Sequence, residues 1–195
     1  RHDQAPLERG PERLAPGDAI VLLAASGIHA NGLSLARKLA ERLPQGYLTE
    51  VAPGLSYGEA LLVPTPLYSP VTEALHRAGI VPHYCANITG HGWRKLLRHP
   101  AALGYRIERI PPVPPVLGFI QHHARQDDRE AYGTLNMGAG FALFVDATDA
   151  QRTVEVAGEA SPAGRLERSA FMPQRDCLLP WYPAIDNAGL ALLNQ

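Results

Sequence analysis

The apolar residues near the start of the chain change from a continuous run to a helical spacing. Ala19 to Ala25 form an unbroken apolar run after Pro16 and Gly17, a pattern typical of a strand buried on both faces. Residues 26–32 are rich in turn formers. Apolar residues then recur at intervals of three and four, at Leu33, Ala36, Leu39, Ala40 and Leu43. This pattern predicts a strand, a loop and an amphipathic helix, in that order.

Strand and helix patterns continue to alternate along most of the chain. We predict further helices over 67–78, 93–98 and 149–158, a helix that begins at 114–115, and strands over 80–88, 105–110 and 141–145. Residues 161–195 mix proline, glycine and scattered apolar residues, and we assign them no element. This alternation predicts an α/β or α+β sandwich in which helices cover a mixed sheet.

Composition and charge exclude several classes of protein. The chain has 195 residues, 46% hydrophobic and 19% charged, as in an ordinary globular domain. A formal net charge of −1 argues against a nucleic-acid binder. The longest apolar run is far shorter than the roughly 18 residues of a membrane helix, and the polar start is no signal peptide. Because Cys85 and Cys177 alone cannot build a disulfide framework, we expect a cytoplasmic protein.

Three segments combine glycine with asparagine, threonine, serine or histidine at the ends of predicted strands. They span residues 26–34, 87–92 and 136–140. Backbone N–H groups beyond strand ends and at helix starts favour an anion such as phosphate. In the first segment Gly27 and Gly32 would allow an oxyanion to approach, and Asn31 and Ser34 would supply donors. The alternative is a tight turn with an ordinary helix cap, and spacing alone leaves both interpretations open.

Other kinds of chemistry find little support in the sequence. Neither GxxxxGK[ST] nor GxGxxG occurs. His83, Cys85 and His91 lack a fourth ligand at zinc-site spacing, so we predict no metal site. Ser26 and His29 share one loop without an orienting carboxylate, which argues against a hydrolase triad. The chain has one local basic cluster, made up of Arg94, Lys95, Arg98, Arg106 and Arg109. Most such clusters are a solvated face, although one arginine could reach a phosphate.

Five blocks of the sequence resemble, in order, the motifs of the aminoimidazole ribonucleotide (AIR) synthetase family. Residues 16–38, ending in SGIHANGLSLARK, resemble the family's PGD, apolar strand and SSG(L/I)HSNGYSLVRK. YGEALLVPTPLY at 57–68 resembles GEALLxPTxIY, and ANITGHG at 86–92 resembles HITGGG. PVPPV at 112–116 and YGTLNMGAGF at 132–141 resemble PVPPIF and MYRTFNMGIGM. The last two blocks distinguish this family from its relatives in thiamine phosphate, selenophosphate and hydrogenase-maturation chemistry.

The resemblance implies an enzyme that closes the imidazole ring of purines. ATP with Mg²⁺ phosphorylates the formyl oxygen of formylglycinamidine ribonucleotide, and the amidine nitrogen then attacks the activated carbon and expels phosphate. In this family the amino-terminal half builds a homodimer and carries most of the acidic Mg–ATP ligands, while the carboxyl-terminal half closes the cleft. The chain resembles the second half. We therefore interpret residues 1–15 as a linker from a missing amino-terminal half, 16–160 as the family's C-terminal domain and 161–195 as an irregular extension.

Matched residue by residue, the resemblance assigns ligand contacts to all three glycine-rich segments and names no catalytic group. These residues are Ser26, Gly27, His29, Asn31, Gly32, Ser34, Thr89, Gly90, Gly92, Asn136 and Gly138. The chain departs from the family where Ala30 replaces serine, Leu33 replaces tyrosine and His91 replaces glycine. These changes remove hydroxyls or add a bulky ring beside the ligand. They support a second hypothesis, a non-catalytic or regulatory paralogue that keeps the fold and a phosphate site.

Overall fold

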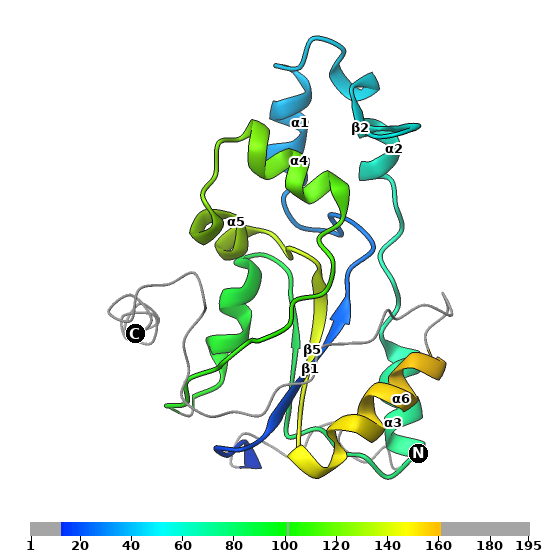
Figure 1. Cartoon of the computed structure of the whole chain (residues 1–195), viewed down its shortest axis with the longest axis vertical. Helices are drawn as coiled ribbons and strands as arrows, with labels where there is room; N and C mark the ends of the chain where they lie inside the picture. The colour runs from blue at the N-terminus through cyan, green and yellow to red at the C-terminus, as the bar shows by residue number, and fades with distance from the viewer. Residues whose placement is uncertain (1–12, 101, 161–195) are drawn as a thin grey trace, which may run out of the picture.

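A three-stranded sheet with the strand order β1-β5-β4 forms the centre of the molecule (Figure 1). The structure is a computed structural model that describes residues 13–100 and 102–160. The strands are β1 (Ala19–Ala24), β4 (Tyr84–Asn87) and β5 (Ala139–Val145). The expected α/β class is confirmed. Both ladders of this sheet are antiparallel, however, where we expected a mixed sheet, because β1 and β4 both run against the central β5.

Helices and short turns surround this sheet. The α-helices are α1 (Leu33–Ala40), α2 (Tyr57–Leu61), α3 (Ser69–Arg77), α4 (Pro115–His123), α5 (Asp128–Thr134) and α6 (Ala150–Ala160). The 3₁₀ turns are η2 (Gly46–Leu48), η3 (Gly92–Arg98) and η4 (Ala147–Asp149), and β2 (Glu50–Ala52) pairs with β3 (Leu55–Ser56) in a small second sheet. The helices predicted from Leu33, over 67–78, over 93–98, from Pro114–Pro115 and over 149–158 are confirmed, with small differences in their ends.

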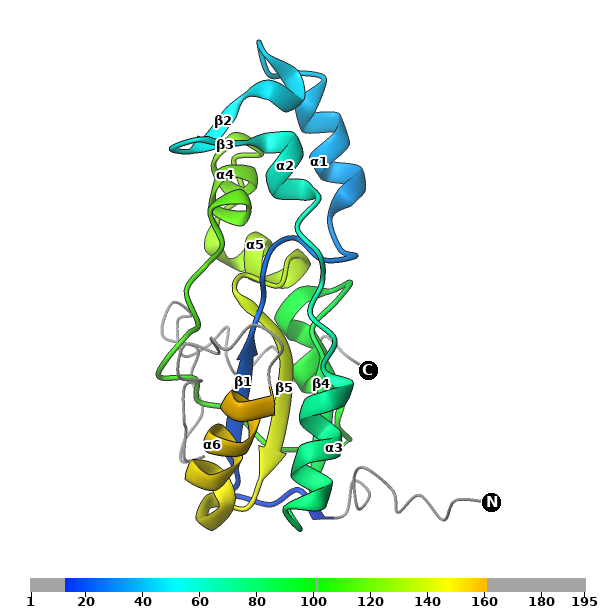
Figure 2. The ribbon, with the colours of Figure 1, turned by 90° about the vertical axis from the view of Figure 1, so that its right-hand side faces the viewer.

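The two faces of the sheet are covered by different elements. Alternate strand residues point to opposite faces, so each strand contributes to two apolar layers. One layer packs against α3 and α6, which lie side by side in Figures 1 and 2, and includes Val21, Leu23, Leu75, Leu143 and Val145. The other packs against η3 and the segment after it, and includes Ile20, Leu22, Trp93, Tyr105 and Phe144. β1 and β5 are therefore buried on both faces, as the continuous apolar runs predicted.

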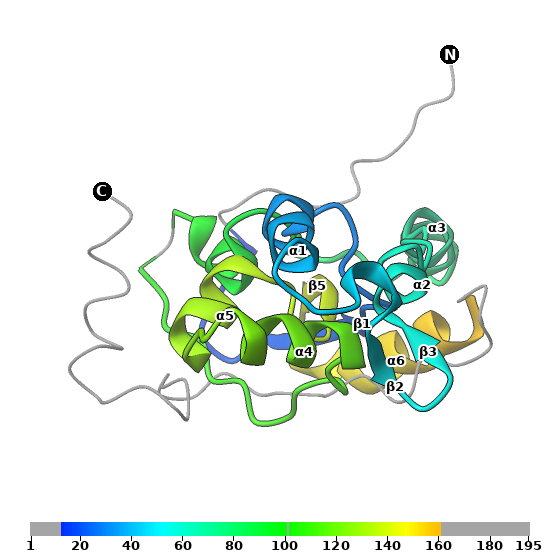
Figure 3. The same ribbon diagram turned by 90° about the horizontal axis from the view of Figure 1, so that it is seen from above.

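A third apolar cluster lies beyond one end of the sheet. It joins α1, α2, α4 and α5, which Figure 3 shows grouped above β1 and β5. Its largest fully buried side chains are Ile28, Tyr57, Leu117, Ile120 and Leu135. The Tyr57 hydroxyl donates to the carbonyl of Ala36 in α1 at 3.1 Å, which satisfies the one polar atom that this ring buries. The cluster places the start of α1 and the end of α5 directly over the end of the sheet.

Two predicted strands differ from the structure. The strand expected over 80–88 is formed only by Tyr84–Asn87, since Ile80 closes the end of α3 by donating its N–H to Leu75 at 2.9 Å. The strand expected over 105–110 is wrong, because these residues form no ladder. Tyr105 and Ile107 are nevertheless buried, and the Tyr105 ring meets Phe144 at 5.4 Å. The alternating pattern there reflects an irregular segment lying on the sheet face.

The linker interpretation of residues 1–15 and the irregular extension of 161–195 lie mostly or entirely outside the described residues. Within 13–100 and 102–160, no helix combines the length and the apolar character that a membrane crossing requires.

Candidate functional site at the glycine-rich edge

The three glycine-rich segments meet at one edge of the sheet. Because β5 runs against both neighbours, its amino end lies beside the carboxyl ends of β1 and β4 (Figure 2). Backbone hydrogen bonds close this edge: the N–H of Ala25 donates to Gly138 at 2.8 Å, and that of Ile88 donates to Gly140 at 2.9 Å. All the residues that the resemblance assigned to ligand contacts lie in these segments. We call residues 26–34, 87–92 and 136–140 the glycine-rich edge.

Asn136 ties these segments together from the inside. The residue is only 1% exposed. Its side-chain nitrogen donates to the carbonyls of Gly27 at 2.8 Å and Ile28 at 3.4 Å, and its side-chain oxygen accepts from Gly138 N–H at 3.1 Å. Its own carbonyl accepts from the indole N–H of Trp93 at 2.6 Å. Asn136 therefore acts as a buried support of the edge.

Asn31 makes a second tie, nearer the surface. Its side-chain nitrogen donates to the carbonyl of Thr89 at 3.0 Å and also to the carbonyl of Thr134 at the end of α5. A primary amide has two N–H donors, and both are used by these carbonyls. The sequence analysis treated Asn31 as a donor to an anion. The structure gives those donors protein partners, so the anion contact of this side chain stays a prediction.

Two glycines of the edge are required by the chain itself. A β-carbon at Gly92, which has φ +52°, would lie 2.2 Å from the carbonyl oxygen of Tyr132. At Gly138, with φ +96°, it would lie 2.7 Å from the carbonyl oxygen of Pro111. Protein backbone fills the space beside each of them, so both are needed for packing before any ligand is considered.

His29 is buried with a defined ring orientation. The N–H of Ser26 donates to His29 Nε2 at 3.2 Å, so this nitrogen carries no proton and Nδ1 is the protonated one. Burial lowers the pKa of the ring below 6.5, which favours this neutral form. The Ser26 hydroxyl lies 3.3 Å from Nε2 but donates to the carbonyl of Pro64 at 2.7 Å. His29 thus presents Nδ1–H as a donor, and Ser26 is not arranged as an activated nucleophile.

Tyr68 contributes to the edge, although the sequence analysis assigned it no role. Its hydroxyl donates to the carbonyl of Ala24 at 3.0 Å, and burial raises its pKa. A β-carbon at Gly140 would overlap this hydroxyl and lie 2.8 Å from Cε1 of His29. The missing side chain of Gly140 therefore leaves the space that the Tyr68 hydroxyl and the His29 ring occupy. The signal was present in the block YGEALLVPTPLY, whose last residue is Tyr68.

The three candidate metal ligands, His83, Cys85 and His91, do not form a metal site. His83 pairs with Asp18 at 2.8 Å, and Asp18 lies at the start of β1, at the opposite end of the sheet from His91. In the described ranges no three histidine, cysteine, aspartate or glutamate side chains group to hold a metal ion. The described part of the edge is therefore rich in hydrogen-bond donors but supplies no carboxylate cluster.

Comparison with known proteins identifies the family. Residues 15–170 match the family described as "AIR synthase related protein, C-terminal domain". This chain belongs to that family. The expected resemblance is thereby confirmed for most of the sequence, including all three segments of the glycine-rich edge.

Curated relatives of this AIR synthase related chain carry the name phosphoribosylformylglycinamidine cyclo-ligase. One from Methanococcus maripaludis is 37% identical over 164 residues, which cover 81% of this chain and 46% of the relative. One from Methanocaldococcus jannaschii is 39% identical over 73% of this chain and 41% of the relative. One from Agathobacter rectalis is 33% identical over 74% and 43%, respectively. The chain thus spans a little under half the length of the relatives it matches.

We expect Asn136→Ala to lower the free energy of unfolding of the AIR synthase related domain by about 2–4 kcal/mol, because it leaves three buried backbone groups without a partner. Urea denaturation followed by circular dichroism measures this change. Asn87→Ala, at an exposed position at the end of β4, is the matched control and should change stability by less than about 0.5 kcal/mol. Equal effects of the two substitutions would contradict the supporting role of Asn136.

The neutral His29 predicts a pH dependence of stability. Above pH 6.5 the ring is neutral in both the folded and the unfolded chain. As the pH falls below 6.5, the unfolded chain binds a proton before the folded one, so stability is lost down to the lowered pKa. His29→Asn removes this titration, and asparagine tolerates the positive φ of this position. The difference in unfolding free energy between wild type and variant should shrink from pH 7 to about pH 5; a constant difference would show that His29 does not contribute.

Proposed function

We propose that this chain is the carboxyl-terminal half of a phosphoribosylformylglycinamidine cyclo-ligase. The enzyme would use ATP to close formylglycinamidine ribonucleotide to aminoimidazole ribonucleotide in purine biosynthesis. The main support is the meeting of three family motifs at one sheet edge in a chain whose relatives carry this name. The edge offers donors to anionic oxygens, and both substrates of this reaction carry phosphate groups.

The chemistry places modest demands on this half of the protein. Transfer of a phosphoryl group to the formyl oxygen turns that oxygen into a leaving group, and the amidine nitrogen then forms the ring bond as phosphate departs. Ring closure is intramolecular, so a site that holds the substrate near its attack geometry lowers the barrier. In our proposal the hydroxyls of Ser34 and Thr89 and the Nδ1–H of His29 hold phosphate oxygens. The residues that the structure describes do not fit a magnesium site.

The remaining parts of the proposal concern what lies outside this half. We propose that a second half, equal to the portion of the relatives that this chain does not span, supplies the acidic ligands for Mg–ATP and builds a homodimer. We also propose a cytoplasmic location. The isolated chain should then bind ATP only weakly, because its described residues contain no carboxylate cluster for the metal.

A fusion tests this proposal directly. The chain is joined to the amino-terminal portion of the Methanocaldococcus jannaschii relative, supplied with ATP, Mg²⁺ and formylglycinamidine ribonucleotide, and the product is followed by mass spectrometry. We expect formation of aminoimidazole ribonucleotide by the fusion and none by either half alone. A fusion that folds, as judged by circular dichroism, but yields no product would contradict the proposal.

A non-catalytic or regulatory paralogue is the second candidate, and His91 is the observation that favours it. His91 has φ +76° and an exposed side chain at a position where the family motif has glycine. A β-carbon is disfavoured at such a backbone angle by roughly 1–2 kcal/mol. The chain nevertheless has histidine at this position, and its exposed imidazole ring lies at the glycine-rich edge.

Substitutions at His91 distinguish crowding from a useful contact. If the ring crowds the ligand, His91→Gly should raise kcat/KM of the fusion and also stabilise it, by about 1 kcal/mol. His91→Ala removes the ring but keeps the β-carbon, so it should raise kcat/KM without the gain in stability. We expect this outcome. A fall in kcat/KM in both variants would instead show that the imidazole contacts a phosphate.

A further inference from the structure

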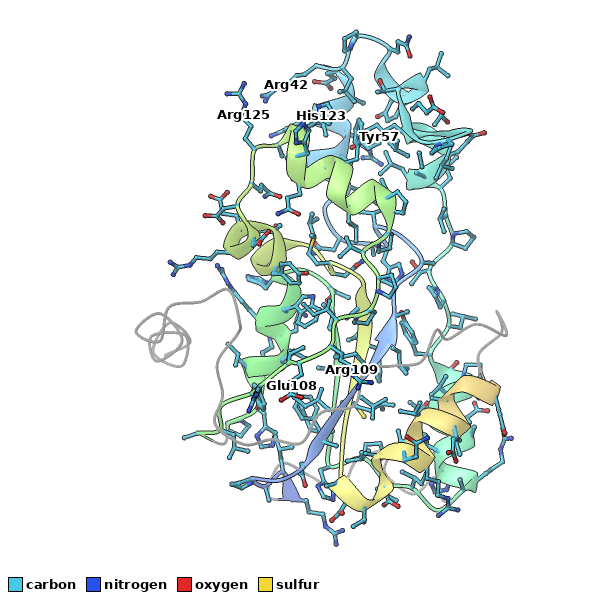
Figure 4. The ribbon with its side chains drawn as sticks, viewed as in Figure 1. Arg42, Tyr57, Glu108, Arg109, His123 and Arg125 are labelled. Atoms are coloured by element: carbon cyan, nitrogen blue, oxygen red, sulfur yellow. The ribbon has the colours of Figure 1, made fainter. Side chains whose placement is uncertain are left out.

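Three arginines of the basic cluster, Arg94, Arg106 and Arg109, have different surroundings in the structure. Arg106 pairs with Glu108, with Nε and Oε1 3.0 Å apart. Arg109 lies alongside the sheet, well below α5 (Figure 4). Arg94 is in the first turn of η3, and its N–H donates to the carbonyl of His91 at 3.1 Å. Arg94 thus directly adjoins the glycine-rich edge.

The guanidinium of Arg94 lies against the backbone of α5. A β-carbon at Gly133 would be 2.9 Å from Nη2, 3.1 Å from Cζ and 3.2 Å from Nε of Arg94. These three similar distances show that the plane of the guanidinium faces Gly133 and occupies the place of its missing side chain. Gly133 is buried, whereas Arg94 is exposed to solvent on its other side. Packing on Gly133 therefore restricts where this long side chain can lie.

The donors of this guanidinium have no protein partner within residues 13–100 and 102–160, where no hydrogen bond or ion pair of the Arg94 side chain is formed. The next residue after Gly133 is Thr134, whose carbonyl accepts from Asn31. His91 accepts the backbone N–H of Arg94, and Glu130 lies one turn before Gly133 in α5. An arginine that is held by packing, with its donors unpaired, is prepared to bind an oxyanion because little rotamer entropy is lost on binding.

We propose that Arg94 contacts a phosphate group at the glycine-rich edge, and that the missing side chain of Gly133 holds its guanidinium in the binding position. The inference deepens the proposed function, because it rests on phosphorylated substrates reaching this edge. The phosphate is either the single phosphate of the ribonucleotide or part of the polyphosphate of the nucleotide. Both present the same oxyanions to a guanidinium.

Titrations of the 195-residue chain with two probes test the proposal and separate these sources. Ribose 5-phosphate represents the ribonucleotide and inorganic tripolyphosphate represents the nucleotide, and binding is followed by amide NMR shifts. We expect millimolar dissociation constants, and Arg94→Ala should raise the constant for the preferred probe roughly tenfold. The probe whose affinity depends on Arg94 identifies the source.

Gly133→Ala is the decisive variant. It leaves Arg94 and the net charge intact, and alanine is favoured over glycine in a helix, so α5 should not be weakened. The new methyl group would displace the guanidinium, and we expect the same roughly tenfold loss of affinity. Arg98→Ala, on the same 3₁₀ turn, removes one charge elsewhere and should change affinity less than about twofold.

Three results of the titrations would overturn the proposal: no binding of either probe by the wild-type chain, equal losses in Arg94→Ala and Arg98→Ala, or unchanged affinity in Gly133→Ala. These results are distinct from failure of the proposed function. A chain that binds phosphate through Arg94 but whose fusion forms no product would keep the contact and lose the ligase. A fusion that turns over equally well with Arg94→Ala would keep the ligase and lose the contact.

Discussion

The buried residue Asn136 holds together parts of the chain that lie 43 and 109 residues away from it in the sequence, through its backbone carbonyl and its side-chain amide. Its backbone carbonyl accepts from the indole N–H of Trp93, its side-chain nitrogen donates to the loop after β1, and its side-chain oxygen accepts from the N–H of Gly138. Each of these groups is buried and would lose a hydrogen bond without a replacement from water. The shape of the glycine-rich edge therefore depends on one amide, and the antiparallel pairing of β5 with both neighbours brings that amide into place.

Backbone strain is concentrated at the same edge. Three of its non-glycine residues, His29, His91 and Met137, have positive φ angles of 56°, 76° and 40°. Such angles cost on the order of 1 kcal/mol each and persist only where the surrounding contacts enforce them. The hydrogen bonds of Asn136 and Asn31 supply this enforcement. Strain held by a buried network gives loops whose N–H groups and side chains keep fixed directions, which suits the positioning of a substrate that the proposed ring closure requires.

The sequence predicted what local patterns determine and missed what distant contacts determine. The continuous run Ala19–Ala25 and the spacing from Leu33 identified a buried strand and an amphipathic helix, because burial and periodicity are local properties. The alternation at 105–110 was misleading, since Tyr105 packs on Phe144 from an irregular segment. Helix α5 was not predicted although Asp127 caps it, because an aspartate at this position is equally typical of a polar loop. The antiparallel strand order required pairing between residues more than 100 positions apart, as between Ala19 and Val145.

The same distinction applies to the site. The motifs pointed to three segments that the structure brings together at one edge. Residue type predicted Asn31 as a donor to an anion, and the resemblance added Asn136 to the binding residues, whereas the fold uses both side-chain amides for its own carbonyls. The donors available to an anion are those that have no partner within the described residues or that face solvent. Arg94 is such a group, and its place beside the glycine-rich edge and the packing of its guanidinium on Gly133 distinguish it from the other cations of its cluster. A donor edge without described carboxylates can hold phosphate oxygens but does not supply ligands for their metal ion, so the chemistry proposed here requires acidic groups from outside the described residues.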